Sequence, residues 1–568
     1  MGLFDRLRGG DDPRVAFFGI DGVPYSLVAD EPETFPTLTA LAEEGSAGPI
    51  DSIVPPESSA CWPSLTTGVN PGETGVYGFQ DREIDSYETY VPMGRDVQAS
   101  RVWDRVEAAE RSATVMNVPV TFPPQRDLQR MVSGFLSPGI DAAAYPDELR
   151  ETLEELEYRI DVNAKLGHDE DKADFIEDAH RTLDARYEAF NHYVQADDWD
   201  LFFGVFMTTD RVNHFLFEDY ETDGEYAEEF REFYAQVDEY LGQLRDTLPD
   251  DVTMVVASDH GFTTLEHEVH CNEWLEREGW LSYRDRYDVY LNRWLAKENW
   301  LAGAEDAEDV AELDPETKAF SPEPGAVVVN TADAEAPGAV EDAAAVRTEI
   351  SDALADLTAD DGTPLVADIE HREADIHTAD IEVIPAGGDE LNVVFHEDVG
   401  ADQWLERGHR ELADIADETR AYSLIPGRFY LNLEGREPRG GVPADDYESV
   451  RTELRTAIEE LEGPEGRPVV ERVVPKEEAF RGDHDEIAPD LVAIPNHGFD
   501  LKAGFKGSEE VFDTGPRNGM HTFGNASLFI DDPEVQLNDA DLYDVAPTLL
   551  ELLDIDFERS AFDGASLV

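Results

Sequence analysis

The sequence predicts an α/β protein with a doubly wound, mostly parallel sheet and helices on both faces. Short, continuous apolar runs recur along the first half of the chain, and longer amphipathic segments separate them. Several of these runs end directly in an acidic or glycine turn, as strands buried on both faces often do. Strands that alternate with helical segments favour parallel pairing through helical crossovers.

The first buried strand is expected over Val15–Ile20, directly before Asp21 and Gly22. The same reasoning predicts strands at Thr114–Val120, Met131–Phe135, Leu201–Met207 and Val252–Ala257, and helices at Pro36–Glu44, Pro146–Tyr158, Glu170–Val194 and Tyr226–Leu248. In open parallel sheets, ligands bind at the carboxyl ends of the strands. Asp21, Asp210 and Asp259 each follow a predicted strand, so we expect them to meet at one rim of the sheet.

Residues 281–484 have a different composition, richer in Ala, Asp and Glu and punctuated by Gly and Pro. Strands are predicted there at Ala326–Asn330 and Phe429–Leu433, and a helix at Tyr447–Leu461. We interpret the stretch as an inserted α+β cap or accessory domain. The core then comprises residues 13–280 and 485–568, and its second part has predicted strands at Asp490–Ile494 and Ala526–Ile530 and a helix at Val545–Leu553.

The chain is strongly acidic, with 128 Asp and Glu against 43 Lys and Arg, a net charge of −85. A hydrophobic fraction of 41% excludes a disordered acidic chain. Because the charge is spread along the whole length, we expect adaptation to a high-salt cytoplasm such as that of a halophilic archaeon. There the Debye length falls to about 3 Å at molar salt. An acidic surface for a basic partner is the alternative, and the lack of a basic stripe excludes an extended nucleic-acid surface.

Only two cysteines occur, Cys61 and Cys271, which excludes a disulfide framework. No segment approaches the roughly 20 apolar residues of a membrane span, and the N-terminus lacks the apolar stretch of a signal peptide. The sequence therefore predicts a cytoplasmic protein without a membrane span. It makes no prediction of the oligomeric state.

Residues 55–68 carry the most specific motif, Pro-Pro-Glu-Ser-Ser-Ala-Cys-Trp-Pro-Ser-Leu-Thr-Thr-Gly, and Pro71-Gly72 and Gly75 follow. This segment resembles the nucleophile segment of the alkaline phosphatase superfamily, in particular its type I phosphodiesterase/nucleotide pyrophosphatase branch and related predicted archaeal phosphohydrolases. In those relatives the nucleophile stands ten residues before the Gly of a Thr-Gly pair, which here is Ser58. Further matches follow in the family's order: Asp21-Gly22, Asp210-x-x-x-His214, Asp259-His260-Gly261, Gly519-Met520-His521, residues 544–550 and Asp563-Gly564.

The resemblance covers most of residues 13–290 and 485–568, and it implies a two-metal site. One ion would be held by Asp21, Asp259, His260 and Ser58, the other by Asp210, His214 and His521. Mixed carboxylate and imidazole ligands suit Zn²⁺, or Mn²⁺, better than Mg²⁺ or Ca²⁺. The implied function is metal-dependent hydrolysis of a small-molecule phosphate ester, a diester or a monoester, through a metal-bound Ser58 and a covalent phospho-enzyme intermediate.

Two alternative functions remain open from the sequence: a cofactor-independent phosphomutase-like isomerase with the same site, and a non-catalytic binding protein with a relict site. Ser59 competes with Ser58 as the nucleophile. A sulfatase is disfavoured, because Leu65 replaces the signature's Arg and Cys61 stands seven residues before Gly68, not ten.

Candidate substrate contacts come from residues near these motifs. Cys61 takes a position that is often Asn in the relatives, and the guanidinium groups of Arg82, Arg211 and Arg517 can clamp a phosphate. Each Arg is equally suited to a surface ion pair in so acidic a chain. Trp62 and Phe79 are candidates for stacking on the organic part of a substrate, with core packing as the alternative.

Overall fold

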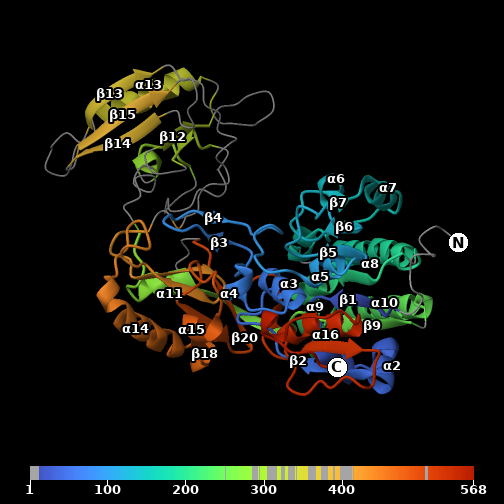
Figure 1. Cartoon of the computed structure of the whole chain (residues 1–568). Coiled ribbons are helices and arrows are strands. Elements are labelled where there is room, and N and C mark those ends of the chain that lie inside the picture. The colour runs from blue at the N-terminus through green and yellow to red at the C-terminus, as the bar shows by residue number, and fades with distance from the viewer. Residues whose placement is uncertain are drawn as a thin grey trace. The chain divides into compact units, whose positions relative to one another are not determined.

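The protein is represented by a computed structural model (Figure 1). It describes residues 12–568 except 170, 197, 250, 284–291, 293, 303–315, 322–325, 331–339, 341, 356–365, 373–380, 388–389, 397–411, 413–414 and 506–509. The chain divides into two compact units. The first holds residues 1–280, 420–504 and 510–568, and the second holds 281–419 and 505–509.

The second unit is shorter than the insert predicted over residues 281–484, because residues 420–484 belong to the first unit. Two of their strands, at 428–431 and 470–475, pair with the strand at 491–495, which anchors them there. At the junction, the backbone N–H groups of Arg420 and Ala421 donate to the carbonyl oxygen of Trp280 at 2.7 and 3.1 Å. The chain therefore leaves the first unit and re-enters it at hydrogen-bonded neighbours.

The first unit is built on an eight-stranded sheet of order β2-β23-β9-β1-β8-β5-β6-β7. The five strands from β9 to β6 are parallel, and the strands outside them pair antiparallel. The bounds are β1 (Arg14–Ile20), β2 (Ser46–Ile50), β5 (Ala113–Val118), β6 (Arg130–Ser133), β7 (Ala144–Tyr145), β8 (Leu201–Phe206), β9 (Val252–Ala257) and β23 (Ala526–Ile530). The predicted fold class is confirmed.

Alternate residues of β1 enter two hydrophobic cores, one on each face of the sheet, because successive side chains of a strand point to opposite faces. Ala16 and Phe18 pack in the core that includes α2 (Pro36–Glu44), α7 (Asp147–Glu155), α8 (Ala173–Val194), α9 (Thr208–Thr222) and α10 (Ala227–Thr247). Val15 and Phe17 pack in the core that includes α3 (Ser58–Thr67), α5 (Val102–Ala108) and α16 (Val545–Leu552). Both faces of the strand are therefore dry.

Most predicted helices of the first unit form near their expected bounds, and α2 matches them fully. The predicted first residue of α8, Glu170, lies outside the described residues. Sequence reasoning did not predict α9, which starts two residues after β8. The remaining helices are α1 (Tyr25–Asp30), α4 (Pro71–Thr74), α6 (Ile140–Ala143), α11 (Cys271–Arg277), α14 (Tyr447–Glu459) and α15 (Lys476–Ala479).

Smaller sheets complete the first unit. In one, β10 (Gly261–His270) pairs with β20 (Gly498–Lys502), β21 (Phe512–Asp513) and β22 (Gly519–Thr522). Another has the order β16 (Ala421–Ile425), β17 (Arg428–Leu431), β19 (Leu491–Pro495), β18 (Val470–Pro475), and β3 (Asp81–Arg82) pairs with β4 (Thr89–Tyr90). The strand predicted at Asp490–Ile494 thus forms as β19, but it joins a small sheet and not the central one.

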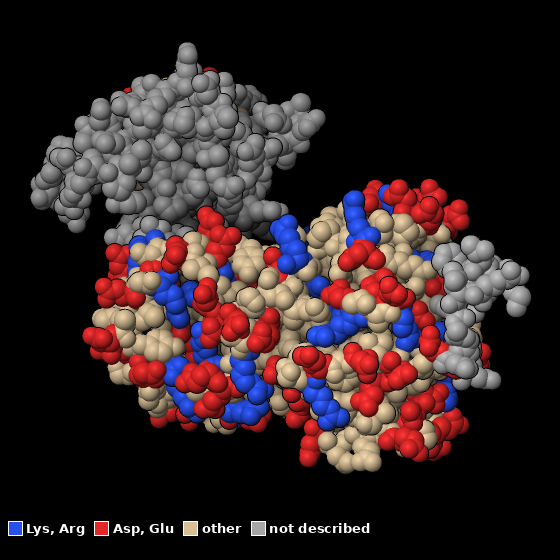
Figure 2. All heavy atoms as spheres, in the orientation of Figure 1, with Lys and Arg blue, Asp and Glu red and all other residues tan. Residues whose placement is uncertain are grey.

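The second unit contains a five-stranded sheet and a helix, which makes it α+β. Its strand order is β11 (Ala319–Phe320), β12 (Ala326–Val329), β14 (Ile381–Gly387), β15 (Glu390–His396), β13 (Val366–Arg372), and α13 spans Ala343–Ala355. Figure 2 shows acidic side chains spread over the visible face of the described residues, with basic ones between them. No helix within the described ranges has the length and apolarity needed to cross a bilayer.

Candidate active site

Three neighbouring strands bring Asp21, Asp210 and Asp259 to one rim of the central sheet. Strand β1 lies between β8 and β9 and is parallel to both, with Gly19 opposite Ala257 and Ile20 opposite Phe206. Asp21 and Asp259 each stand two residues beyond the paired Gly19 and Ala257 and are therefore level across the rim. Asp210 follows β8 in the first turn of α9. All three side chains are buried.

The turn after β1 depends on the backbone conformation of Gly22 and on hydrogen bonds from Gly22 and Val23. Gly22 has a φ of 68°, a conformation that a side chain disfavours. A Cβ there would also stand 3.1 Å from the Phe262 ring and 3.2 Å from the His260 ring. The Gly22 N–H donates to Asp259 Oδ1 at 3.3 Å, and the Val23 N–H donates to Ser258 Oγ at 2.9 Å. These bonds tie the turn after β1 to the turn after β9.

Ser58, the first residue of α3, lies directly beside Asp21 and His260. Its Oγ is 3.3 Å from Asp21 Oδ1 and 3.1 Å from His260 Nε2. His260 Nε2 is in turn 3.6 Å from Asp21 Oδ1 and 3.6 Å from Asp259 Oδ2. We call Asp21, Ser58, Asp259 and His260 the serine cluster. Asp259 Oδ2 is buried and has no hydrogen-bond partner among the described residues.

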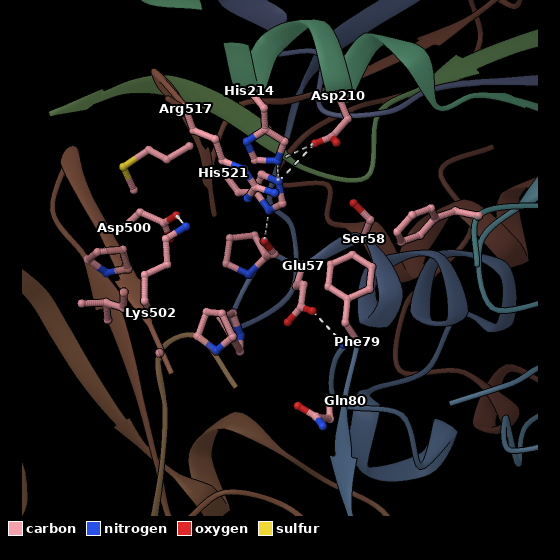
Figure 3. A pocket seen from close by; sticks show the side chains of 18 of the residues that line it. Glu57, Ser58, Phe79, Gln80, Asp210, His214, Asp500, Lys502, Arg517 and His521 are labelled. Atoms are coloured by element: carbon pink, nitrogen blue, oxygen red, sulfur yellow. Dashed lines mark hydrogen bonds and ion pairs between the residues drawn. The ribbon is translucent and has the colours of Figure 1, made fainter. Parts of the chain in front are cut away.

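Asp210, His214 and His521 form a second group, the histidine cluster. Asp210 and His214 lie one turn apart on α9, and β22 carries His521 opposite Phe262 of β10. His521 Nε2 is 3.1 Å from Asp210 Oδ1 and 3.1 Å from His214 Nε2, and His214 Nε2 is 3.5 Å from Asp210 Oδ1. The three residues and Ser58 are seen together in Figure 3.

The Nδ1 atoms of the cluster's two histidines face main-chain carbonyl oxygens. His214 Nδ1 is 3.1 Å from the Gly519 oxygen, and His521 Nδ1 is 3.0 Å from the Pro56 oxygen. A carbonyl oxygen only accepts, so each Nδ1 must carry a proton and donate it. In the neutral rings each Nε2 then presents a lone pair toward Asp210, and three lone pairs meet. Metal-ligating histidines show this pattern.

The spacing of the donor atoms suits divalent cations. Four ligands at about 2.0–2.2 Å in a tetrahedron lie about 3.3–3.6 Å from one another, close to the separations within both clusters. Asp21, Asp259 and His260 form one group with metal-binding geometry, and Asp210, His260 and His521 form another. His260 belongs to both groups, and its ring stacks on His521 with centroids 3.9 Å apart. The unpartnered Asp259 Oδ2 fits a cation in the serine cluster.

Burial disfavours the charged forms of Asp21, Asp259 and His260 in the serine cluster. Desolvation, together with the charges of Asp259 and Asp210, raises the pKa of Asp21 well above its ordinary value. Desolvation and the Asp210 charge raise the pKa of Asp259 to about 7. Desolvation and the nearby His521 lower the pKa of His260 to about 3, so its imidazole is neutral. A neutral His260 beside the crowded carboxylates of Asp21 and Asp259 leaves their negative charge for a cation to offset.

The two clusters open into a cavity of about 520 Å³ in the first unit. Ser58, Asp210, His214 and His521 line its inner side. Basic groups at the cavity are Arg211, Lys502 and Arg517, and its apolar lining includes Val91, Phe79, Phe135, Leu136 and Pro426. The cavity can therefore hold an anionic group against Ser58 and an organic group against the apolar side.

Arg211 lines the cavity, whereas Cys61 and Arg82 do not. Arg211 Nη1 donates to Asp210 Oδ2 at 2.9 Å, Nη2 donates to Asp161 at 3.0 Å, and the guanidinium lies 4.4 Å from the Phe135 ring centroid. Cys61 is fully buried in the α3 core, with its Sγ 3.4 Å from Ser52 Oγ. The expectation that Cys61 contacts substrate therefore finds no support in its position.

Arg82 is 2% exposed and paired with Glu437 at 2.7 Å, which keeps it from reaching a substrate. Trp62 is also buried, whereas Phe79 lines the cavity. Sequence reasoning did not find Asp500 and Lys502, which line the cavity from β20. Nothing in the local sequence marks them, because their place depends on β20 pairing with β10.

Comparisons with known proteins agree with this architecture. The profile of a family described as type I phosphodiesterase / nucleotide pyrophosphatase matches residues 15–379, well into the predicted insert. No curated protein matches the chain. Phosphonoacetate hydrolase from Sinorhizobium meliloti 1021 is 14% identical, with 96% of each chain covered and a TM-score of 0.50.

Two further solved structures are similar at lower scores. Murine ectonucleotide pyrophosphatase / phosphodiesterase 5 is 11% identical over 97% of each chain with a TM-score of 0.45. Alkaline phosphatase PafA is 12% identical over 99% of each chain with a TM-score of 0.44. Because both TM-scores are below 0.5, phosphonoacetate hydrolase is the one of these three structures that supports the fold seen in the sheet topology.

Proposed function

The chain belongs to the type I phosphodiesterase / nucleotide pyrophosphatase family, and from this premise we propose that it is a metal-dependent hydrolase of small-molecule phosphate esters with Ser58 as the nucleophile. The family supports phosphoester hydrolysis in general. The serine and histidine clusters support the more specific mechanism, because Asp21 and His260 contact the buried Ser58 hydroxyl and the histidine cluster lines the same cavity as Ser58.

Two divalent cations would be held by these clusters. The ligands of one would be Asp21, Asp259, His260 and Ser58, and those of the other Asp210, His214 and His521. Three imidazoles among the ligands favour Zn²⁺, with Mn²⁺ as the second choice. When bound, such ions would offset the charge of the phosphoryl oxygens and lower the pKa of the Ser58 hydroxyl.

Ser58 forms and breaks the bonds to phosphorus in this mechanism. Ser58 gives its hydroxyl proton to water and its Oγ forms a bond to phosphorus, while the bond from phosphorus to the ester oxygen breaks and the released alkoxide takes a proton back from water. A water molecule then forms a new bond to phosphorus, the Ser58–phosphorus bond breaks, and Ser58 recovers its proton. Ser58 heads α3, whose N-terminal N–H groups favour an anion at this position.

The observation that carries the proposal is the contact of Ser58 Oγ with both Asp21 and His260. Its test compares Ser58→Ala with Ser59→Ala, using bis-p-nitrophenyl phosphate and p-nitrophenyl phosphate as substrates and elemental analysis for bound metal. We expect Ser58→Ala to lose turnover by at least about 1000-fold and Ser59→Ala to keep most of it. Unchanged turnover in Ser58→Ala would refute the role of Ser58.

A further inference from the structure

Arg517 stands in the segment that leads into β22, four residues before His521. Its neighbour Asn518 is held at three points. The Asn518 N–H donates to the His214 carbonyl oxygen at 2.9 Å, and the Asn518 main-chain carbonyl oxygen accepts from the Leu265 N–H at 2.9 Å. Asn518 Nδ2 donates to Asp219 at 3.2 Å. The backbone that carries Arg517 is therefore fixed against the helix of the histidine cluster.

The side chain of Arg517 lines the active-site cavity. Figure 3 shows it beside His214 and His521, and its charge acts on His214 and on Asp500. The guanidinium thus lies at the same end of the cavity as the histidine cluster.

Arg517 differs from the other two basic side chains of the cavity in having no hydrogen-bond or ion-pair partner among the described residues. Arg211 is paired with Asp161 and Asp210, and Lys502 is paired with Asp500 and Glu268. Arg517 makes no hydrogen bond or ion pair with any residue in the part of the chain that the structure describes. In a chain with 128 acidic residues and 43 basic ones, a cavity-lining guanidinium that no described carboxylate contacts directly is available for a ligand.

We propose that Arg517 binds a second negative charge of the substrate, beyond the single charge of a simple phosphodiester. This inference rests on the proposed function, since it concerns the ester cleaved at Ser58. The charge can belong to the transferred phosphoryl group, as in a monoester, or to a phosphate on the leaving part, as in a nucleoside triphosphate. Both present oxygens that a guanidinium fork binds with two parallel hydrogen bonds.

The charges around Ser58 explain why a further cation is useful. Glu57, Asp210 and Asp500 line the cavity, and Arg428, Arg211 and Lys502 pair with them in turn. Each of these three pairs is neutral, so the paired side chains add no positive charge for the substrate beyond that of the proposed cations. A dianionic substrate therefore gains more from Arg517 than a monoanionic one does, and Arg517 should set the preference between them.

The test measures kcat/KM of wild type, Arg517→Ala and Arg517→Lys with three substrates. These are bis-p-nitrophenyl phosphate with one charge, p-nitrophenyl phosphate with two charges on phosphorus, and ATP with additional charges on the leaving pyrophosphate. We expect Arg517→Ala to lose about 10- to 100-fold on at least one multiply charged substrate and less than about threefold on the diester. Arg517→Lys should recover part of the loss. The affected substrate identifies where the second charge sits.

Arg455→Ala is the matched control, because Arg455 lies on α14, has a side chain that is 43% exposed and pairs with Glu459 on the same helix. It should leave all three rates unchanged. Inorganic phosphate gives a second readout, since its inhibition constant should rise in Arg517→Ala. Equal losses on all three substrates, or no loss on any, would overturn the inference. Wild-type protein that cleaves none of the three would instead overturn the proposed function.

Discussion

The indole N–H of Trp62 donates to Asp21 Oδ2 at 2.6 Å, so a core residue orients a proposed metal ligand. Trp62 is fully buried one turn after Ser58 on α3, and its ring packs edge-on against Phe17 and Phe203. The hydrophobic core beneath the sheet is in this way bonded directly to the serine cluster.

Trp62→Phe should weaken metal binding because Asp21 Oδ2 loses the indole N–H, its one hydrogen-bond donor among the described residues. Loss of such a supporting bond costs about 10- to 100-fold in metal affinity, and a buried unsatisfied oxygen costs about 1–3 kcal/mol of folding free energy. Competition titration with a chelator measures the affinity. Trp103→Phe is the control, because Trp103 occupies the same core but donates to Gln125. Equal metal affinities in the two variants would contradict the prediction.

Removing metal should lower the melting temperature as well as the activity. The carboxyl groups of Asp21 and Asp259 are buried together, and their raised pKa values reflect the cost of their charge without a cation. An ion at 100 times its dissociation constant adds about 2.7 kcal/mol to stability. Differential scanning calorimetry with and without a chelator measures the shift. The Asp259→Asn protein should show a smaller shift, and a chelator with no effect on wild type would exclude tightly bound ions.

Acid should destabilise the first unit through Asp490. Burial alone would raise the pKa of this carboxyl, but hydrogen bonds from Arg436, the Leu431 N–H and Tyr447 hold it below its ordinary value. A depressed pKa stabilises the fold above the unfolded pKa of about 3.9, and the contribution is lost as pH falls through the lower folded value.

Asp490→Asn should therefore lower stability at pH 7 by about 1–3 kcal/mol, because the buried donors around Asp490 lose their anionic acceptor, although Arg436 keeps its ion pair with Glu437 at 2.9 Å. It should also flatten the dependence of the melting temperature on pH below about 4. Glu459→Gln, on an exposed pair with Arg455, is the control and should change little. An Asp490→Asn protein as stable as wild type at pH 7 would contradict this.

Salt should stabilise the protein, because a net charge of −85 repels itself. Raising KCl from about 0.1 M to about 1 M shortens the Debye length from about 10 Å to about 3 Å. We expect the melting temperature to rise by several degrees over this range, measured by circular dichroism. Sucrose at matched osmolality does not screen charge, so it should raise the melting temperature less.

The rim of the sheet could be predicted from the sequence because each acid there closely follows the apolar segment that forms its strand. Asp21 and Asp259 follow apolar runs long enough to be read as strands, and β1, β8 and β9 prove to be neighbours. The direction in which a side chain on a helix points depends on how that helix packs, which the local sequence does not determine. Cys61 was expected at the substrate, but it turns toward Ser52 and the core.

Residues 420–504 make contacts with distant parts of the chain that the local sequence does not predict. Arg82 was a candidate phosphate clamp, yet Glu437, which lies in the predicted insert, pairs with it. Lys502 reaches the cavity only because β20 pairs with β10 across more than two hundred residues of chain. Such long-range pairing leaves no periodic signal in a single sequence.

The junction at Trp280 and Arg420 allows residues 281–419 to vary in length without disturbing the first unit. Because the two residues are joined by a backbone hydrogen bond of 2.7 Å, a short turn could span the gap left by excising residues 281–419. Loop length costs little when the ends already meet. Natural variants could therefore lengthen, shorten or exchange this stretch while the rim that holds Ser58 stays intact.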